Sequence, residues 1–275
     1  MMPVLREIWE RHAMNGTLPL ADTHVHLLAG LDDGPRDADE ALALCRQLVA
    51  EGVRTATALA HQNAMFPDNS PAKIAEATAQ LVKLLAEKNI PLAVCPTGEV
   101  VLSDDLVTRW TNNELQSVGG AKKYLLVEMP HRAFLDPRPA ATALRKLGVR
   151  MIVAHAERYE PMLFDPGFTA ECIAAGCLVQ VTTDAFTMAS ERESAALREW
   201  GTRSMIHLLG SDGHRIDYRR PQWKDGFRIF QRMVGAPAAE KVGSIWGSAV
   251  LQGLNVNPPA PKPRQKSWFN RMFGF

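Results

Sequence analysis

The stretch Leu18-Pro19-Leu20-Ala21-Asp22-Thr23-His24-Val25-His26 contains the pattern from which the rest of the chain can be interpreted. Its apolar start predicts a β-strand over residues 18–26. Alternate side chains of a strand point to the same face, so we expect His24 and His26 to project together. Asp32 and Asp33 follow closely. Paired imidazoles with nearby carboxylates are typical of a divalent metal site, although an isolated H-x-H is also found in exposed histidine pairs.

The alternation of apolar strands with helices continues along the whole chain. Helix starts are indicated by Asp37 with Glu40, and by Ser70 with Pro71. We predict strands at 18–26, 53–60, 91–95, 124–127, 149–154, 177–181 and 205–210, and helices at 37–51, 70–88, 104–113, 139–147, 168–175, 190–200, 223–234 and 238–251. This order implies parallel strands joined by right-handed crossovers. Without a Gly-rich dinucleotide turn, a closed or nearly closed α/β barrel is favoured over a doubly wound sheet.

Side chains able to bind a metal follow six of the seven predicted strands. The residues are His24 and His26, His61, Glu99, Glu128, His155, and Asp212 with His214. Parallel barrels carry their chemistry at the carboxyl ends of the strands. A single His there is usually structural, but six coincidences favour one shared site.

The ligand types constrain the metal and the reaction. Imidazole mixed with carboxylate suits Mn²⁺, Fe²⁺ or Zn²⁺ better than Ca²⁺. The candidates exceed the three protein ligands of a typical catalytic zinc, so we expect two or three ions, with Glu99 bridging a pair. Neighbouring metals are used for in-line displacement at phosphorus. Arg158 and Arg219 follow His155 and His214 closely, and guanidinium groups match phosphate oxygens.

Composition sets limits on other functions. The chain has 275 residues, 46% hydrophobic and 22% charged, with a net charge of +1, which gives no argument for a nucleic-acid partner. The 4 cysteines form no C-x-x-C pair, which favours a reduced, cytoplasmic protein. None is followed by Arg at the spacing of a C-x5-R phosphatase loop. No apolar run is long enough to cross a bilayer, and the N-terminal segment predicts an amphipathic helix, not a signal peptide.

The sequence resembles the PHP-type (polymerase and histidinol phosphatase) metal-dependent hydrolases, and within them the manganese-dependent protein-tyrosine phosphatases of bacterial capsule and exopolysaccharide loci. The resemblance covers roughly residues 21–254, in the order of the family. It rests on Asp22-Thr-His-Val-His26, Leu31-Asp-Asp-Gly34, the His61 segment, Thr97-Gly-Glu-Val100, Leu126-Val-Glu128, Ala154-His-Ala-Glu-Arg-Tyr159 and Ser211-Asp-Gly-His214 with Arg219-Arg-Pro221. The loop after His61, Gln62-Asn63, departs from the family pattern.

The resemblance implies a distorted seven-stranded (β/α)7 TIM-like barrel that hydrolyses phosphotyrosine. It implies a metal site made by His24, His26, Asp33, His61, Glu99, Glu128, His155, Asp212 and His214. Arg158, Arg219, Asp33 and His214 are the expected catalytic residues. The expected cofactor is Mn²⁺, as two or three ions, with Fe²⁺, Zn²⁺, Co²⁺ or Mg²⁺ as alternatives. The implied substrate is the tyrosine-rich tail of a membrane-anchored bacterial kinase.

Three parts of the chain are expected: an amphipathic extension at 1–17, the barrel at 18–254, and a proline-rich, basic and aromatic tail at 255–275. The tail is interpreted as a segment that packs on its own domain or is disordered, or as a contact with a membrane surface or partner. Alternative functions are a phosphoesterase for a small monoester such as histidinol phosphate, a non-catalytic metal-binding scaffold of polysaccharide export, and an amidohydrolase, whose barrel also begins with H-x-H.

Overall fold

The computed structural model describes residues 19–130 and 133–264, which form a seven-stranded sheet in chain order with helices around it. Neighbouring strands are parallel throughout. The strands are β1 (Leu20–Asp22), β2 (Val53–His61), β3 (Ala93–Val101), β4 (Tyr124–Glu128), β5 (Arg150–Val153), β6 (Leu178–Thr182) and β7 (Leu208–Gly210).

The sheet closes into a barrel by backbone hydrogen bonds between its first and last segments. The Asp212 amide donates to the His24 carbonyl over 2.7 Å, and the His26 amide donates to the Gly213 carbonyl over 2.9 Å. These contacts form a seam just beyond the carboxyl ends of β1 and β7. The predicted seven-stranded parallel barrel is therefore confirmed.

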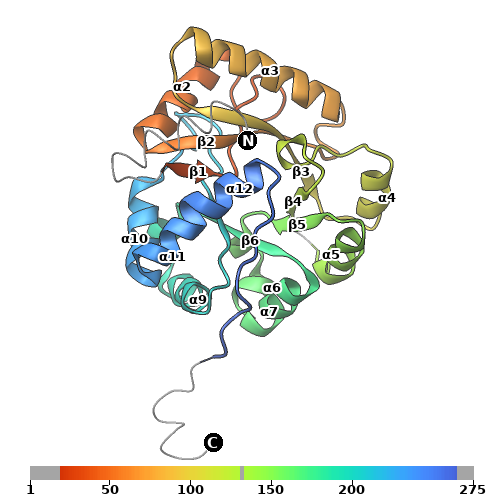
Figure 1. The fold of residues 1–275 in the computed structure, drawn as a ribbon, viewed down its shortest axis with the longest axis vertical. Coiled ribbons are helices and arrows are strands. Elements are labelled where there is room, and N and C mark those ends of the chain that lie inside the picture. The colour runs from red at the N-terminus through yellow and green to blue at the C-terminus, as the bar shows by residue number, and fades with distance from the viewer. Residues whose placement is uncertain (1–18, 131–132, 265–275) are drawn as a thin grey trace, which may run out of the picture.

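The helices surround the barrel on its outer side, except for α12, which lies across one end of it (Figure 1). They are α2 (Ala38–Ala50), α3 (Pro71–Glu87), α4 (Leu106–Thr111), α5 (Pro137–Lys146), α6 (Glu160–Leu163), α7 (Pro166–Ala175), α8 (Ala185–Met188), α9 (Glu191–Thr202), α10 (Lys224–Val234), α11 (Ala236–Glu240) and α12 (Gly247–Leu251), with 3-10 turns η1 (Val118–Gly120) and η2 (Ala156–Arg158). Two predicted starts are confirmed, because the Asp37 side chain accepts from the Glu40 amide and Ser70 accepts from the Lys73 amide.

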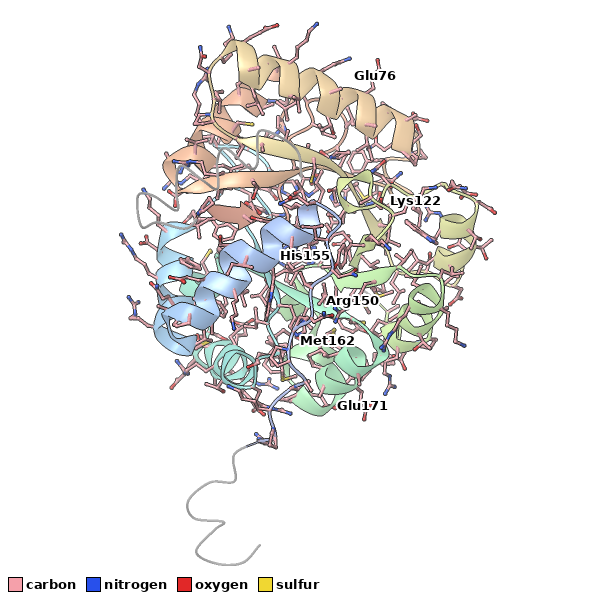
Figure 2. The ribbon with its side chains drawn as sticks, viewed as in Figure 1. Glu76, Lys122, Arg150, His155, Met162 and Glu171 are labelled. Carbon is pink, nitrogen blue, oxygen red and sulfur yellow. The ribbon has the colours of Figure 1, made fainter. Side chains whose placement is uncertain are left out.

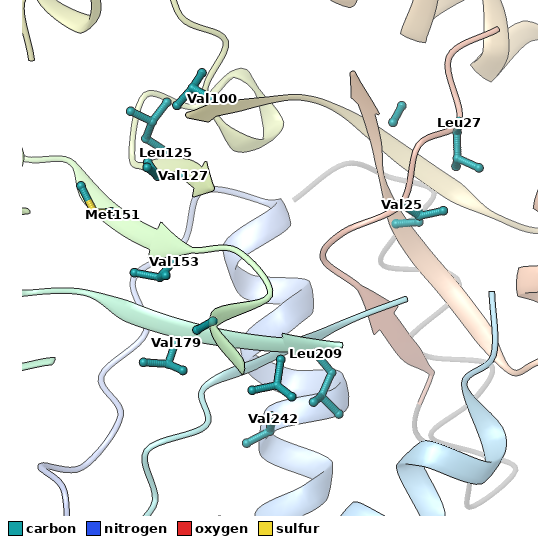
Figure 3. Close-up of a cluster of buried hydrophobic side chains, with 14 of the residues drawn as sticks. Val25, Leu27, Val100, Leu125, Val127, Met151, Val153, Val179, Leu209 and Val242 are labelled. Atoms are coloured by element: carbon teal, nitrogen blue, oxygen red, sulfur yellow. The ribbon is translucent and has the colours of Figure 1, made fainter. Parts of the chain in front are cut away.

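Two apolar layers hold the barrel together. Leu126 of β4 belongs to a buried cluster inside the barrel, whereas Leu125 and Val127 belong to the larger layer between barrel and helices (Figure 3). Apolar residues on both faces are expected of a parallel sheet covered by helices. Helix α12 contributes Val250 and Leu251 to the inner cluster. A Cβ on Gly247 would lie 2.9 Å from the Ala21 Cβ, so glycine permits this close packing.

Three predicted boundaries differ most from the structure, and the strand predicted over 205–210 also begins later, at Leu208. β1 ends at Asp22 instead of residue 26, because the Asp22 carboxylate accepts from the amides of His24 and Ser211 and interrupts the ladder. β3 continues to Val101 instead of ending at residue 95. Proline lacks a donor, but Pro96 lies where β3 pairs with β2 and does not yet pair with β4, so no ladder bond is lost.

The third difference concerns the last helix, predicted as one segment over 238–251. The structure has α11 and α12 joined by a π-helical segment, Lys241–Trp246. Ser244 of this segment donates to the Pro19 carbonyl over 2.6 Å, and Ser248 lies 3.4 Å from Thr55. The π-helical turn is wider than an α-helical turn, and with it Ser244 and Ser248 both reach their partners at the base of the barrel.

The described part of the C-terminal tail lies on its own domain. The Tyr124 hydroxyl donates to the Leu254 carbonyl, and Arg150 donates to the Val256 carbonyl. Figure 2 labels Arg150 beside this segment. Farther on, the amide of Lys262 donates to the carbonyl of Arg203. The predicted extension at 1–17 and the aromatic end of the tail lie outside the described residues. In the described part of the chain, no helix is long and apolar enough to cross a membrane.

His207, a buried residue just before β7, predicts that the fold is sensitive to acid. Burial, together with the Arg150 charge, lowers the pKa of His207 to about 3. Its Nδ1 accepts from the Val179 amide over 3.0 Å, which requires the neutral ring. A folded-state pKa below the unfolded value near 6.5 stabilises the fold above that value, and this contribution is lost as the pH falls.

We expect His207→Asn, which retains an acceptor for the Val179 amide, to lose less stability on acidification than the parent chain. Between pH 7 and 4.5 the difference should be about 2–3 kcal/mol. Urea unfolding of both metal-free proteins at the two pH values measures it, and the other titrating groups cancel in the comparison. Equal losses in the two proteins would show that His207 titrates normally.

Candidate metal centre

All nine sequence-predicted ligands meet at the carboxyl end of the barrel. Their donor atoms form overlapping groups whose members lie within 4.8 Å of one another. The groups are His26, Asp33, His61 and His214; His24, His26 and Asp212; His24, Glu99 and His155; and His61, Glu99 and Glu128. The strand ends that supply these residues are far apart in sequence, and barrel closure brings them together.

Glu99 lies at the centre of the cluster. Its Oε2 is 3.3 Å from His24 Nε2, 3.4 Å from His26 Nε2 and 3.2 Å from His61 Nδ1. Its Oε1 is 3.0 Å from His155 Nε2. The carboxylate is buried. One carboxylate that faces four imidazoles is suited to bridge neighbouring cations.

Several buried atoms of the cluster have no hydrogen-bond partner among the described residues. They are His24 Nε2, His26 Nε2, His61 Nδ1 and Glu99 Oε2. Unsatisfied buried polar atoms cost stability. All four are lone-pair donors that a divalent cation accepts, so the residues present fit a metal centre.

The ring nitrogens that point away from the cluster are fixed by hydrogen bonds. His24 Nδ1 lies 2.9 Å from Gln180 Oε1, His26 Nδ1 lies 2.8 Å from Asp32 Oδ2, and His214 Nδ1 lies 2.9 Å from the Asp212 carbonyl. Each acceptor places the ring proton on Nδ1 and leaves Nε2 free to coordinate. Such outer contacts orient histidine ligands in metal sites.

Sequence reasoning missed two of these orienting residues. Gln180 lies in β6, whose end carries no ligand, and an amide within an apolar strand gives little signal of function. Asp32 belongs to the quoted Asp-Asp-Gly segment, but only Asp33 received a role. In the structure, Asp32 also accepts from the amides of Gly34 and His61, so it joins the first two ligand segments.

Asp22, the first residue of the opening motif, supports the centre from behind. Its Oδ1 accepts from the amides of His24 and Ser211, both at 3.0 Å, and its Oδ2 accepts from Trp223 Nε1 at 2.8 Å. Burial raises the pKa of this carboxyl, although the hydrogen bonds oppose the shift. Asp22 therefore connects β1, the β7 loop and the start of α10.

Two ligand residues have left-handed backbone conformations that L side chains rarely adopt. His155 has φ 28° and Asp212 has φ 51°. Such conformations cost free energy and are concentrated at functional sites. Each residue lies two positions after the end of a strand, β5 for His155 and β7 for Asp212, where the backbone turns.

The electrostatics of the cluster favour positive charge. Burial alone would lower the pKa of His24, but Glu99 and Asp212 raise it well above its ordinary value. The pKa of His26 rises to about 10, against the effect of burial, because of Asp32 and Glu99. For Glu99 the directions are reversed. Burial alone would raise the pKa of this carboxyl, but the neighbouring His24 outweighs burial and holds the pKa well below its usual range. The carboxylates are therefore ionised at neutral pH, as metal ligands must be.

Both predicted arginines reach one carboxylate of the cluster. Arg158 and Arg219 each donate to Asp212 Oδ2, at 2.5 Å and 2.8 Å. The other oxygen, Oδ1, lies 3.3 Å from His24 Nε2. Asp212 therefore connects the guanidinium pair to the imidazole cluster. The arginines are partly exposed, so they are accessible to a ligand that approaches from solvent.

The loop that departs from the family pattern has a structural role. Gln62 is buried, and its side chain donates to the Asn69 carbonyl and accepts from the Gln116 amide. Asn69 in turn donates to the His61 carbonyl. The loop brings Phe66 against the His61 ring, with centroids 5.7 Å apart and planes at 6°. Gln62 thus supports His61 from outside the cluster.

Known proteins share this fold and this sequence pattern. The chain is 27% identical to tyrosine-protein phosphatase YwqE of Bacillus subtilis, over 93% of this chain and 100% of that protein. It is 23% identical to tyrosine-protein phosphatase CpsB of Streptococcus pneumoniae, over 81% of this chain and 94% of that protein. The structure superposes with a TM-score of 0.79 and 24% identity on one from a study of YwqE and CpsB, described as unique metal-dependent tyrosine phosphatases, covering 89% of this chain and 99% of that one.

The family described as capsular polysaccharide synthesis, CpsB/CapC, matches residues 20–252. This range includes every strand and all nine residues of the cluster. It agrees with the resemblance drawn from the motifs, which is confirmed. The chain belongs to the CpsB/CapC family of capsular polysaccharide synthesis.

Proposed function

We propose that this chain is a metal-dependent phosphatase that hydrolyses phosphotyrosine in proteins. The observation that carries the proposal is the cluster of nine ligand residues with two arginines on one of its carboxylates. The names of the curated relatives support the substrate class, since they are tyrosine-protein phosphatases.

The proposed metal ligands are the nine residues of the cluster, with Glu99 bridging. We propose two or three Mn²⁺ ions, and Fe²⁺, Zn²⁺, Co²⁺ or Mg²⁺ would suit the same mixture of imidazole and carboxylate. Divalent ions in these positions would lower the pKa of water towards neutrality and so supply a nucleophile for phosphorus.

The chain's own side chains bind and orient the substrate. Arg158 and Arg219 are proposed to hold the phosphate oxygens and to offset charge that develops during the reaction. Asp33 is the most open member of the cluster, with a side chain 54% exposed, and lies 3.4 Å from His214 Nε2. Asp33 and His214 are therefore proposed to face the incoming substrate. Because His214 Nδ1 is held by the Asp212 carbonyl, Nε2 is the atom left to coordinate or to exchange a proton. A tyrosinate leaving group, with a pKa near 10, needs little acid assistance.

The family's connection with capsular polysaccharide synthesis suggests where the substrate is found. We propose the tyrosine-rich tail of a membrane-anchored bacterial kinase as the substrate. Activity in the cytoplasm, close to the inner face of the membrane, is part of this proposal. The catalytic unit is proposed to be residues 18–254.

Chelation tests the metal proposal. We expect removal of bound metal to abolish turnover of a phosphotyrosine peptide and added Mn²⁺ to restore it. Thiol alkylation of the folded protein should have no effect, because the four cysteines are buried and burial raises the pKa of Cys45, Cys95 and Cys172 to about 12. Activity that survives chelation but is lost on alkylation would indicate a cysteine nucleophile. Metal binding without turnover would favour a scaffold, and turnover restricted to small monoesters would favour the histidinol-phosphatase-like alternative.

A further inference from the structure

A pocket next to the metal centre has an aromatic wall that the metal site itself does not require. It has a volume of about 390 Å³ and is lined by His155, Arg158, Met129, Phe134, Tyr159 and neighbouring residues. His155 belongs to the cluster described above, and Arg158 donates to its Asp212. The pocket is therefore continuous with the place where a phosphate would be held.

Phe134 stands out in this wall because 62% of it is exposed. Its ring nevertheless has a defined position, since it stacks on Tyr159 with centroids 6.3 Å apart and planes at 15°, and contacts Phe168 at 5.9 Å. An exposed aromatic side chain that its neighbours hold in place keeps one face available for a ligand. Large exposed apolar groups are informative when they border a binding site.

Tyr159 is fixed in a way that gives its ring a structural role. Its hydroxyl donates to the Leu135 carbonyl and accepts from the Leu135 amide, both at 3.1 Å. The hydroxyl is thus already engaged, and burial raises the pKa of this phenol. Its role is to join the segment that carries Phe134 to the η2 turn that carries Arg158. Aromatic wall and phosphate-binding arginine are therefore positioned by the same turn.

We infer that the Phe134–Tyr159 pocket binds the aromatic ring of phosphotyrosine and gives the site its preference for aryl over alkyl phosphates. The inference rests on the proposed phosphatase function. A phosphate held by Arg158 would leave the phenol ring against the Phe134 face, where offset stacking is favourable. A phosphoserine has no ring for this surface, and its short side chain would leave the pocket unfilled.

Binding of phosphonates tests the pocket without requiring turnover. Phenylphosphonate and methylphosphonate are titrated calorimetrically into the Mn²⁺-loaded full-length chain. The parent chain should bind phenylphosphonate at least about tenfold more tightly, and Phe134→Ala should lose most of that advantage while its methylphosphonate affinity stays the same. Phe134→Tyr should restore it, and Val82→Ala, an exposed change on α3, should resemble the parent chain.

Turnover separates failure of the pocket from failure of the phosphatase proposal. For two peptides of one sequence, Phe134→Ala should lower kcat/KM for phosphotyrosine by about tenfold and leave phosphoserine turnover unchanged. No phenyl advantage in the parent chain, or equal losses for both ligands or both peptides, would overturn the pocket assignment. A phenyl advantage without any phosphotyrosine turnover would support the pocket and refute the phosphatase function.

Discussion

Glu99→Gln is expected to abolish both metal binding and phosphotyrosine hydrolysis. The substitution keeps the shape of the side chain but removes the charge that faces His24, His26, His61 and His155. Loss of an outer contact to a metal ligand typically costs 10–100-fold, so loss of the central bridging ligand should cost at least about 10³-fold. Elemental analysis of the purified variant and steady-state turnover measure the two effects.

The matched control is Glu76→Gln, the same chemical change on the outer helix α3, which should leave metal content and rate unaltered. Circular dichroism establishes that the Glu99 variant is folded. A folded variant that retains both metal and rate would show that Glu99 is not a ligand. Because His24 and His26 would lose a buried counter-charge, the metal-free variant should also be less stable near neutral pH.

Replacing either arginine should separate phosphate binding from metal binding. Arg158→Met or Arg219→Met is expected to lower kcat/KM for a phosphotyrosine peptide by about 10²–10³-fold, the range seen when one preorganised donor to a reacting centre is removed. Metal content should stay at the parent level, since neither residue belongs to the ligand groups.

The two arginine substitutions should not be additive. Both guanidiniums donate to Asp212 Oδ2, so removal of one alters the position of the other. The control is Arg192→Met, because the Arg192 guanidinium lies over the Phe164 ring and neither residue belongs to the cluster. This substitution should leave metal content and turnover unchanged. If a variant loses metal along with activity, the arginine would be shown to support Asp212 and not to bind the substrate.

The fold and the gathering of the nine candidate ligands could be predicted from the sequence because they follow simple physical patterns. Several predicted strands end in His, Asp or Glu, and this recurrence defines the rim of a parallel barrel. Closure of the barrel then brings His24 close to His214, which is far from it in sequence. The resemblance supplied Asp33, which lies in a loop and has no strand pattern of its own. Boundaries failed where tertiary contacts override local preference, as at Pro96 in β3 and the π-helical segment before α12.

The residues that orient the ligands could not be predicted. Gln180 is recognised only once the barrel is closed, because its amide oxygen accepts from Nδ1 of His24, which lies 156 residues earlier in the chain. The aromatic pocket likewise requires two segments, around Phe134 and Tyr159, whose contact is a property of the folded chain. Sequence reasoning selected the side chains that meet at the end of the barrel, whereas the structure shows which residues hold them in place.

The seam between β1 and β7 would make completion of the whole metal centre a late event in the folding of the chain. The His24 carbonyl is bonded to the Asp212 amide, so the first and last ligand segments stay apart until the barrel closes. A chain emerging from the ribosome exposes His24 and His26 long before Asp212 and His214 are made. Long-range closure of this kind is slow compared with local helix formation. Metal bound by the complete set of ligands would therefore report a closed barrel, and it would stabilise the contact between the first and last strands.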